Sequence, residues 1–121
     1  MKALLIAAHG SRKAEFNQEV LSLAERVAQA AGGQFDLVRS GFIQFAEPSF
    51  ADQVAALVAA GVTRITVVPY FTAAGSHVRS DIPALMEAAR KRFPQIQWRT
   101  TTHLGGLAGI PELIVQAAVN S

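Results

Sequence analysis

The chain carries three histidines, His9, His77 and His103, and no cysteine. Imidazole binds borderline divalent metals and also accepts protons near neutral pH, so histidines grouped at one place can serve either task. The lack of cysteine excludes disulfides, thiolate nucleophiles and cysteine-ligated metal sites. Each histidine follows an apolar run of the kind that forms a strand. We therefore ask whether the fold brings these strand ends together.

His9 is followed by Gly10-Ser11-Arg12-Lys13 at the junction of a predicted strand and a predicted helix. Gly10 permits a tight turn and the close approach of a ligand. Ser11 either caps the helix or donates to an anion, and Arg12 adds positive charge at a helix start that favours anions. The site interpretation assigns His9 to metal binding and catalysis, and Ser11 and Arg12 to substrate binding. The alternative is an ordinary helix cap with solvated charges.

The segment 70–81 is longer than a usual connection from strand to helix, which favours a functional loop. Tyr70 and Phe71 are expected to wall a flat hydrophobic ligand. Gly75 and Ser76 let the backbone bend so that His77 points back toward the sheet edge. We predict His77 as the second catalytic and metal-binding residue, and Ser76 as a substrate contact.

Glu47 and His103 have weaker assignments. The carboxylate of Glu47, which precedes a predicted helix, is expected to be a catalytic group, as a third metal ligand or a proton acceptor. Equally, it can simply complement the positive end of that helix. His103 follows the last predicted strand, and its alternative role is to cap the edge of the sheet.

Hydrophobic periodicity predicts the elements that position these residues. Apolar or β-branched runs indicate strands at residues 3–8, 35–42, 64–68 and 96–101. Apolar residues at helical spacing, followed by glycine or proline stops, indicate helices near residues 16–27, 50–58, 82–93 and 111–119. Residues 70–81 are expected to form a loop.

This alternation predicts an α/β fold, a doubly wound, flavodoxin-like three-layer domain with a four-stranded parallel sheet over residues 1–121. The expected strand order is 2-1-3-4, with helices on both faces. In such sheets ligands bind beyond the carboxyl ends of the strands, where the strand order reverses. That rule places His9 and His77 on either side of one crevice.

The composition of the chain excludes several classes of protein. The chain is 50% hydrophobic and 17% charged, which excludes a disordered protein. A net charge of +2 and sparse aromatic residues give no reason to expect a nucleic-acid partner. The apolar run at residues 3–8 is shorter than the core of a secretory signal, and no stretch is long enough to span a membrane. We expect a cytoplasmic protein.

Short motifs follow the predicted strands, and together they extend over most of the chain: His9-Gly10-Ser11, Glu47-Pro48-Ser49, Pro69-Tyr70-Phe71, Gly75-Ser76-His77-Val78, Asp81-Ile82-Pro83 and Leu104-Gly105. In these motifs the chain resembles the short sirohydrochlorin chelatases. These are the small cobaltochelatases of cobalamin synthesis, which have nickel- and iron-inserting relatives. Thr72 departs from the pattern, since an apolar residue is expected there.

The resemblance implies a chelatase-like domain of the class II chelatase fold. It implies that His9 and His77 bind the incoming divalent metal and help to take up the pyrrole protons of a tetrapyrrole. The metal is then a substrate, with Co²⁺ favoured and Ni²⁺ or Fe²⁺ as alternatives, and no organic cofactor is expected. Because larger chelatases place two such domains across one cleft, the resemblance also implies a homodimer with a shared cleft.

The chemistry of the residues is consistent with that implication. Metal insertion must remove two pyrrole protons while it delivers a dication, and a neutral imidazole can bind a cation or accept a proton. A polycarboxylate tetrapyrrole needs cationic partners, for which guanidinium groups are well shaped. The candidate cationic residues are Arg12, Lys13, Arg39 and Arg79.

Two other functions remain open at this point. A metal or tetrapyrrole carrier of the same fold would use the same residues without turnover. A histidine-dependent phosphoryl-transfer enzyme would use His9-Gly10 at a strand end, but Ala8 stands where such an enzyme would place an arginine to hold phosphate.

Overall fold

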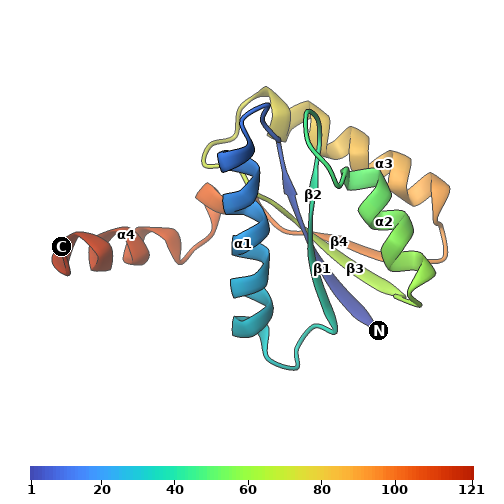
Figure 1. Ribbon diagram of the computed structural model, residues 1–121, viewed down its shortest axis with the longest axis horizontal. Helices are drawn as coiled ribbons and strands as arrows, with labels where there is room; N and C mark the ends of the chain where they lie inside the picture. Colours follow the sequence, from blue (N-terminus) through green and yellow to red (C-terminus); the bar gives the residue numbers. More distant parts are fainter.

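Strands and helices alternate along the chain as the periodicity predicts (Figure 1). The computed structural model describes residues 1–121, except that the side chain of His77 lies outside the described part. The strands are β1 (Lys2–Ala8), β2 (Leu37–Phe42), β3 (Arg64–Pro69) and β4 (Gln97–Thr100). The helices are α1 (Ala14–Ala31), α2 (Phe50–Ala59), α3 (Ile82–Arg92) and α4 (Ile110–Val119), with a π-helical turn η1 (His77–Asp81) and a 3₁₀ turn η2 (Leu104–Gly106).

The four strands form one parallel sheet in the order β2-β1-β3-β4, which confirms the predicted topology. Ala7 near the end of β1 pairs with Gly41 of β2 on one side and with Pro69 of β3 on the other. The carboxyl ends of these three strands are therefore level with one another. The strand order reverses between β1 and β3, where doubly wound sheets bind their ligands.

Helices cover both faces of the sheet. In Figure 1, α1 lies against one face, and α2 and α3 lie against the other. The larger core fills the α2–α3 side, where Leu5, Ile65 and Val67 are completely buried. A smaller core under α1 contains Ile6 and Val38. Because residues on both faces of β1 are buried, the strand reads in the sequence as an uninterrupted apolar run.

Several boundaries differ from the prediction, and two of the differences have a clear structural reason. The second strand begins at Leu37, because the residue before it has another hydrogen-bonding role. The Asp36 carboxylate accepts a hydrogen bond from the backbone N–H of Lys2 at 2.8 Å. The predicted loop 70–81 is shorter, because residues 77–81 form the π-helical turn η1 that leads directly into α3. The N–H of Arg79 donates to the carbonyl of Gly75 at 3.1 Å and closes the first turn.

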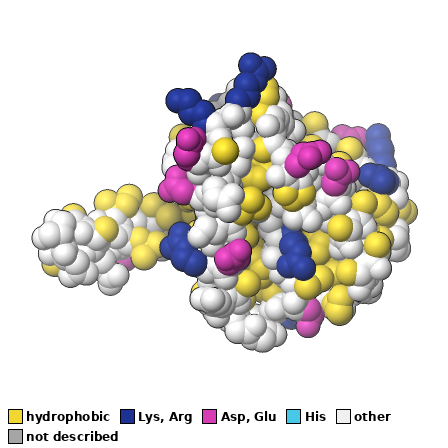
Figure 2. All heavy atoms as spheres, in the orientation of Figure 1, with side chains coloured by type: hydrophobic (Ala, Val, Ile, Leu, Met, Phe, Trp, Pro, Cys, Tyr) yellow, Lys and Arg dark blue, Asp and Glu magenta, His cyan; other side chains and the backbone are white. Residues whose placement is uncertain are grey.

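The last helix forms where it is predicted, but it covers neither face of the sheet. Figure 1 shows α4 extending away from the other elements, and Figure 2 shows hydrophobic side chains exposed along it. Leu113, Ile114 and Val115 each have at least 60% of their surface exposed. No described helix, α4 included, is long and apolar enough to cross a membrane.

Candidate functional site at the carboxyl edge of the sheet

His9 stands at the carboxyl end of β1 with both ring nitrogens engaged. Its Nδ1 lies 3.1 Å from the carbonyl oxygen of Gly10, and the side-chain amide of Gln44 contacts its Nε2. A carbonyl can only accept, so Nδ1 carries the proton and donates it to Gly10. The Nε2 lone pair then accepts from the Gln44 amide. This neutral tautomer is the form of imidazole that can bind a metal or take a proton through Nε2.

Backbone hydrogen bonds also connect the loop after β2 to the end of β1 and to His9. The N–H of Ile43 donates to Ala8 at 2.8 Å, and the N–H of Gln44 donates to the carbonyl of His9 at 3.0 Å. Gly10 makes this close approach possible, since it has a φ of +89° and a Cβ there would lie 1.9 Å from the carbonyl oxygen of Gln44. Glycine is therefore required beside His9.

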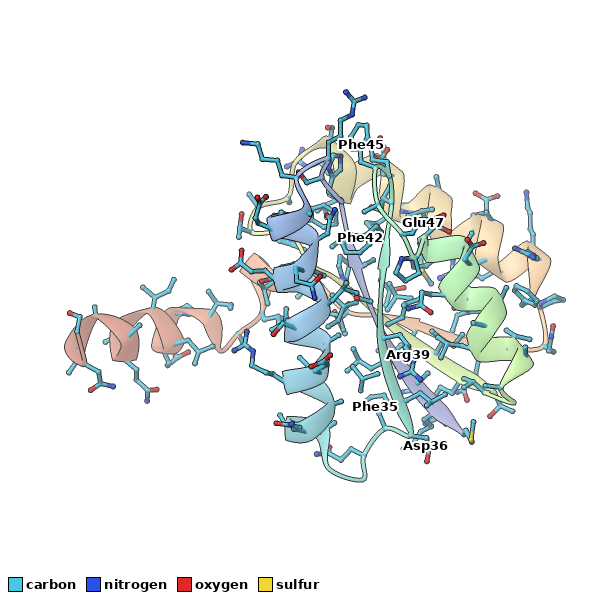
Figure 3. The ribbon with its side chains drawn as sticks, in the orientation of Figure 1. Phe35, Asp36, Arg39, Phe42, Phe45 and Glu47 are labelled. Atoms are coloured by element: carbon cyan, nitrogen blue, oxygen red, sulfur yellow. The ribbon has the colours of Figure 1, made fainter. Side chains whose placement is uncertain are left out.

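Phe45 completes the surroundings of His9, and it lies at the carboxyl end of β2 in Figure 3. Its ring meets the His9 ring edge-to-face with 6.1 Å between centroids, and the Arg12 guanidinium lies 4.8 Å from its centroid. Phe45 is 52% exposed. The backbone of Phe45 is left-handed, with a φ of +65°. An exposed aromatic residue held in that strained region is typical of a functional position rather than of a packing residue.

Ser11 organises the turn between β1 and α1. Its hydroxyl accepts from the N–H of Lys13 at 3.0 Å. Its backbone N–H donates to the Asn17 side chain at 2.9 Å, and the Asn17 amide donates back to the Ser11 carbonyl at 2.7 Å. The N-cap residue of α1 is Lys13, and no side-chain hydrogen bond caps the helix, so the expectation that Ser11 caps it is wrong. The predicted substrate contact of Ser11 stays a prediction.

Glu47 lies on the part of the loop that returns to α2, away from Phe45 (Figure 3). Its side chain is exposed, and Ser49 caps α2 by accepting from the N–H of Asp52 at 3.1 Å. Among the side chains that the structure describes, no group of three histidine or acidic residues is arranged to hold a metal ion. The third-ligand role of Glu47 stays a prediction.

The two aromatic residues after β3 pack on opposite faces of the sheet. Tyr70 lies against the small clusters under α1, and Phe71 lies against the large core beside α2 and α3. Both are only half-buried. Each ring thus supports a different core, and the predicted contact with a flat ligand remains to be tested.

The remaining predicted residues of this loop are exposed. Ser76 and Arg79 are exposed, and the carbonyl of Ser76 accepts from the Ser80 hydroxyl at 2.7 Å. The backbone of His77 begins the π-helical turn η1, a type of turn that is frequent at functional sites. The predicted roles of its side chain lie outside the described residues.

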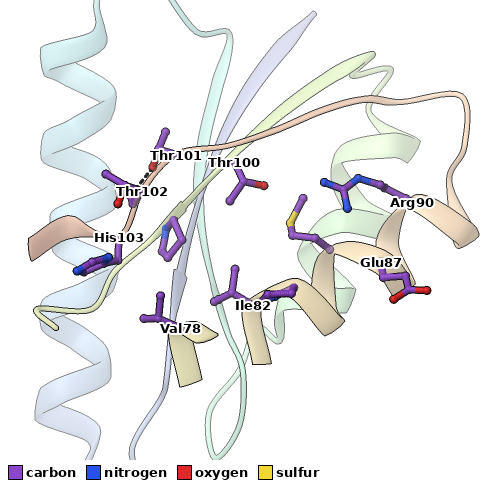
Figure 4. Close-up of a pocket in the computed structure, with 11 residues that line it drawn as sticks. Val78, Ile82, Glu87, Arg90, Thr100, Thr101, Thr102 and His103 are labelled. Carbon is purple, nitrogen blue, oxygen red and sulfur yellow. Dashed lines mark hydrogen bonds between the residues drawn. The ribbon is translucent and has the colours of Figure 1, made fainter. Parts of the chain in front are cut away.

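His103 does not join His9. It lines a separate hollow of about 580 Å³ beyond the ends of β3 and β4, beside η1 and α3 (Figure 4). The other labelled lining residues in that view are Val78, Ile82, Glu87, Arg90, Thr100, Thr101 and Thr102. The hydroxyl of Thr101 donates to the carbonyl of Thr102 at 2.8 Å. At the carboxyl edge of the sheet, His9 and its neighbours therefore lie over β1 and β2, and the hollow lies over β3 and β4.

The structure thus brings His9 and Arg12 together and adds Gln44 and Phe45, which the sequence motifs do not single out. One general rule could have found both residues. They follow β2 within three positions, at the edge where doubly wound sheets bind ligands. We call His9, Arg12, Gln44 and Phe45 the His9 cluster.

Known proteins provide an independent comparison. The model of the CbiX family matches residues 3–121. The chain belongs to the CbiX family. A curated sirohydrochlorin cobaltochelatase of Methanosarcina acetivorans is 37% identical over 89 residues, which are 73% of this chain and 66% of that enzyme. The matched segments span 58–66% of the length of four such archaeal relatives.

Solved structures of CbiX-like proteins share the fold. A cobalamin biosynthesis CbiX protein of Marinobacter aquaeolei aligns over the whole of both chains, with a TM-score of 0.78 and 26% identity. SirB from Bacillus subtilis, solved with Fe³⁺, aligns with 98% of this chain at a TM-score of 0.81 and 26% identity. The aligned part is only 45% of the SirB chain. This CbiX chain therefore corresponds to about half of SirB.

Proposed function

We propose that this CbiX chain is a chelatase that inserts a divalent metal, with Co²⁺ favoured, into sirohydrochlorin or a related polycarboxylate tetrapyrrole. The observation that carries the proposal is the state of His9. Its Nδ1 proton is held by the Gly10 carbonyl, and its Nε2 lone pair is presented at the edge where doubly wound sheets bind ligands. The sequence match to cobaltochelatases over 73% of the chain supports the reaction class.

Insertion exchanges two pyrrole protons for one dication, so the site must bind a cation and accept protons. The Nε2 atom of His9 can do either in turn once the Gln44 amide moves away. His77 is proposed to supply the second imidazole, as metal ligand and proton acceptor. Glu47 is proposed as a further catalytic carboxylate. Ni²⁺ and Fe²⁺ are the alternative metals, since imidazole binds all three and availability decides among them in a cell.

The proposed substrate contacts surround these groups. Arg12 lies within the His9 cluster, where its guanidinium can pair with a carboxylate of the tetrapyrrole rim. Arg79 is exposed near η1 and can do the same from the neighbouring loop. The further proposed contacts are Ser11, Tyr70, Phe71 and Ser76. No organic cofactor is required, because insertion involves neither electron transfer nor a carried group.

We further propose that residues 1–121 act as one chelatase-like domain in a cytoplasmic homodimer, with the two sites facing a shared cleft. The correspondence with about half of SirB supports two copies in place of two tandem domains. Neither a membrane nor a nucleic acid is a proposed partner.

The proposal is tested by turnover. The purified protein is mixed with a tenfold excess of sirohydrochlorin and Co²⁺, and the absorption spectrum of the tetrapyrrole is followed against a protein-free control. We expect several equivalents of metallated product per protomer. Formation of no more than one equivalent, held on the protein, would identify a carrier and overturn the proposal.

A further inference from the structure

Three cationic side chains converge on a hollow at the amino end of the sheet, the edge opposite the His9 cluster. Lys2 begins β1, Arg64 begins β3, and Arg99 lies in β4. The hollow that they line has a volume of about 290 Å³. We call it the amino-edge hollow, and its lining residues are Lys2, Gln34, Phe35, Arg64, Thr66 and Arg99.

The pairing of the strands places these cations on one face of the sheet. Lys2 is directly opposite Arg64 in the register of β1 and β3, and Arg99 is opposite Thr66 in the register of β3 and β4. Thr66 is also opposite Leu4, which packs in a cluster under α1. Because paired residues of neighbouring strands share a face and strands are about 4.8 Å apart, the three cations stand close together on the α1 face.

The positive charge of this group is not neutralised by the protein. None of the three cations forms an ion pair with a described acidic side chain. The carboxylate of Asp36, which follows Phe35 in the chain, instead accepts a hydrogen bond from the backbone N–H of Lys2 at 2.8 Å. Like charges on neighbouring strands repel one another, so an anion that enters the hollow would relieve an unfavourable interaction.

Arg64 is oriented for such an anion. Its Nε donates to the side-chain oxygen of Gln97 at 3.0 Å, and the residue is partly buried. This hydrogen bond fixes the direction of the guanidinium group, and both terminal nitrogens remain without a partner among the described residues. A guanidinium group can bind two oxygens of a phosphate side by side. The hydroxyl of Thr66, which lines the same hollow, can donate a further hydrogen bond.

We propose that the amino-edge hollow binds a phosphate group, either as free phosphate or as the end of a small phosphate ester. Three cations suit a phosphate better than a single carboxylate, because a phosphate carries up to about two negative charges and offers at least three acceptor oxygens. The volume of the hollow lies at the lower limit of the roughly 300–1,000 Å³ that small-molecule sites occupy. The ligand is therefore small.

The amino-edge hollow is separate from the proposed chelatase site. The strand β1 has 7 residues and is therefore about 20 Å long, with Lys2 at one end and His9 beyond the other. In Figure 3, Phe35 of the hollow and Phe45 of the His9 cluster likewise lie at opposite ends of the sheet. The inference goes beyond the proposed function, and a test of phosphate binding can fail or succeed whatever the result of the insertion assay.

The first test measures the affinity for inorganic phosphate by nuclear magnetic resonance titration at low ionic strength, where charge interactions are least screened. We expect saturable binding with a Kd of about 1 mM or below. Arg64→Gln and Arg99→Gln, with folding checked by circular dichroism, are each expected to raise the Kd at least tenfold. Absence of saturable binding to the wild-type protein would overturn the proposal.

Arg90→Gln is the matched control. It removes the same charge from an exposed arginine of α3, which lines the other hollow beside His103. We expect it to change the Kd for phosphate less than twofold. If Arg90→Gln weakened binding as much as Arg64→Gln, the effect would come from net charge or from the other hollow, and the proposal would be wrong.

The same titration locates the anion, because the amide signals of the residues around it shift most. We expect the largest shifts at residues 2, 64–66 and 97–99. Largest shifts at residues 10–13 would place the anion at the start of α1, beside the His9 cluster, and would overturn the proposal.

Two further ligands identify the chemistry of the site. Malonate, a dicarboxylate of similar charge, is expected to bind at least fivefold more weakly than phosphate, and equal affinity would overturn the assignment to phosphate. Glycerol 3-phosphate distinguishes the two forms of the ligand. Tighter binding than inorganic phosphate would support a phosphate ester, and weaker binding would support free phosphate.

Discussion

At the scale of single residues, the chemistry of His9 depends on which groups surround each ring nitrogen. The Gly10 carbonyl accepts a hydrogen bond from the protonated Nδ1, and the Gln44 amide donates a hydrogen bond to Nε2. Sequence alone could place His9, because the apolar run before it predicts a strand that ends at the ligand-binding edge. It could not predict Gln44, whose contact joins positions 35 residues apart and depends on the path of the β2 loop.

Gln44 offers the first prediction. Its amide occupies the Nε2 lone pair that the metal must use, so Gln44→Glu removes this competing donor and adds a carboxylate ligand beside the imidazole. We expect Co²⁺ to bind about tenfold more tightly to Gln44→Glu, a gain of about 1.4 kcal/mol. Isothermal titration with Co²⁺ alone measures it. Gln44→Ala is the control, which lacks the competitor and the added ligand. Binding no tighter than wild type in Gln44→Glu would contradict this account of Nε2.

Phe45 gives the second prediction, because its backbone and its side chain have opposite effects. Glycine relieves the left-handed backbone, so Phe45→Gly is expected to leave the free energy of unfolding unchanged or to raise it by up to about 1 kcal/mol. The lost ring removes contacts with His9 and Arg12, and we expect kcat/KM for metal insertion to fall about tenfold.

Urea unfolding and the insertion assay together check this prediction. Phe16→Ala is the control, since Phe16 is another exposed phenylalanine but lies on α1. It should keep wild-type activity. If Phe45→Gly lost stability and kept its activity, Phe45 would be a packing residue and the prediction would be wrong.

At the scale of elements, the junctions between strands and helices determine where the side chains of the candidate site lie. The strand β1 was predictable because burial on both of its faces makes it a continuous apolar run, and β3 was predictable because its residues are largely apolar or β-branched. The turn η1 was not predictable, because π-helical turns have no distinctive sequence pattern and residues 77–81 read as loop. The position of α4 was not predictable either. The periodicity of its sequence indicates a helix, but no local sequence pattern predicts which surface the helix packs against.

The junction after β1 gives the third prediction. Gly10→Ala would force a Cβ against the Gln44 carbonyl oxygen, at a φ of +89° that other residues rarely adopt. We expect a loss of about 2–4 kcal/mol in the free energy of unfolding, together with displacement of the His9 cluster. Gly33→Ala, at a position where a Cβ meets nothing within 4 Å, is expected to change stability by less than about 0.5 kcal/mol. Urea unfolding of both variants measures the difference; equal effects would contradict the assigned role of Gly10.

At the scale of the whole molecule, the proposed function needs two copies. One chain presents the His9 cluster at one edge of one sheet, and the aligned part of SirB is less than half of that protein. The sequence predicts the parallel sheet and its order from the chain itself. The sequence predicts the dimer only through its resemblance to the chelatases, because an interface between two copies produces no periodic pattern in the sequence.

Dilution gives the fourth prediction. If the cleft is shared by two copies, the specific activity should fall as the protein is diluted below the dissociation constant of the dimer. The activity at each concentration is compared with the dimer fraction from sedimentation at that concentration, and the two curves should coincide. Constant specific activity in a range where sedimentation finds only monomers would contradict the shared cleft.

The central claim is that imidazoles of this sheet edge bind the metal and accept the pyrrole protons. It is tested most directly by initial rates of Co²⁺ insertion into sirohydrochlorin for His9→Ala and His77→Ala, with His103→Ala as the histidine control. The account predicts that kcat/KM falls at least 100-fold in the first two variants and stays within about threefold of wild type in the control, with all three folded by circular dichroism. Wild-type rates in both His9→Ala and His77→Ala would contradict it.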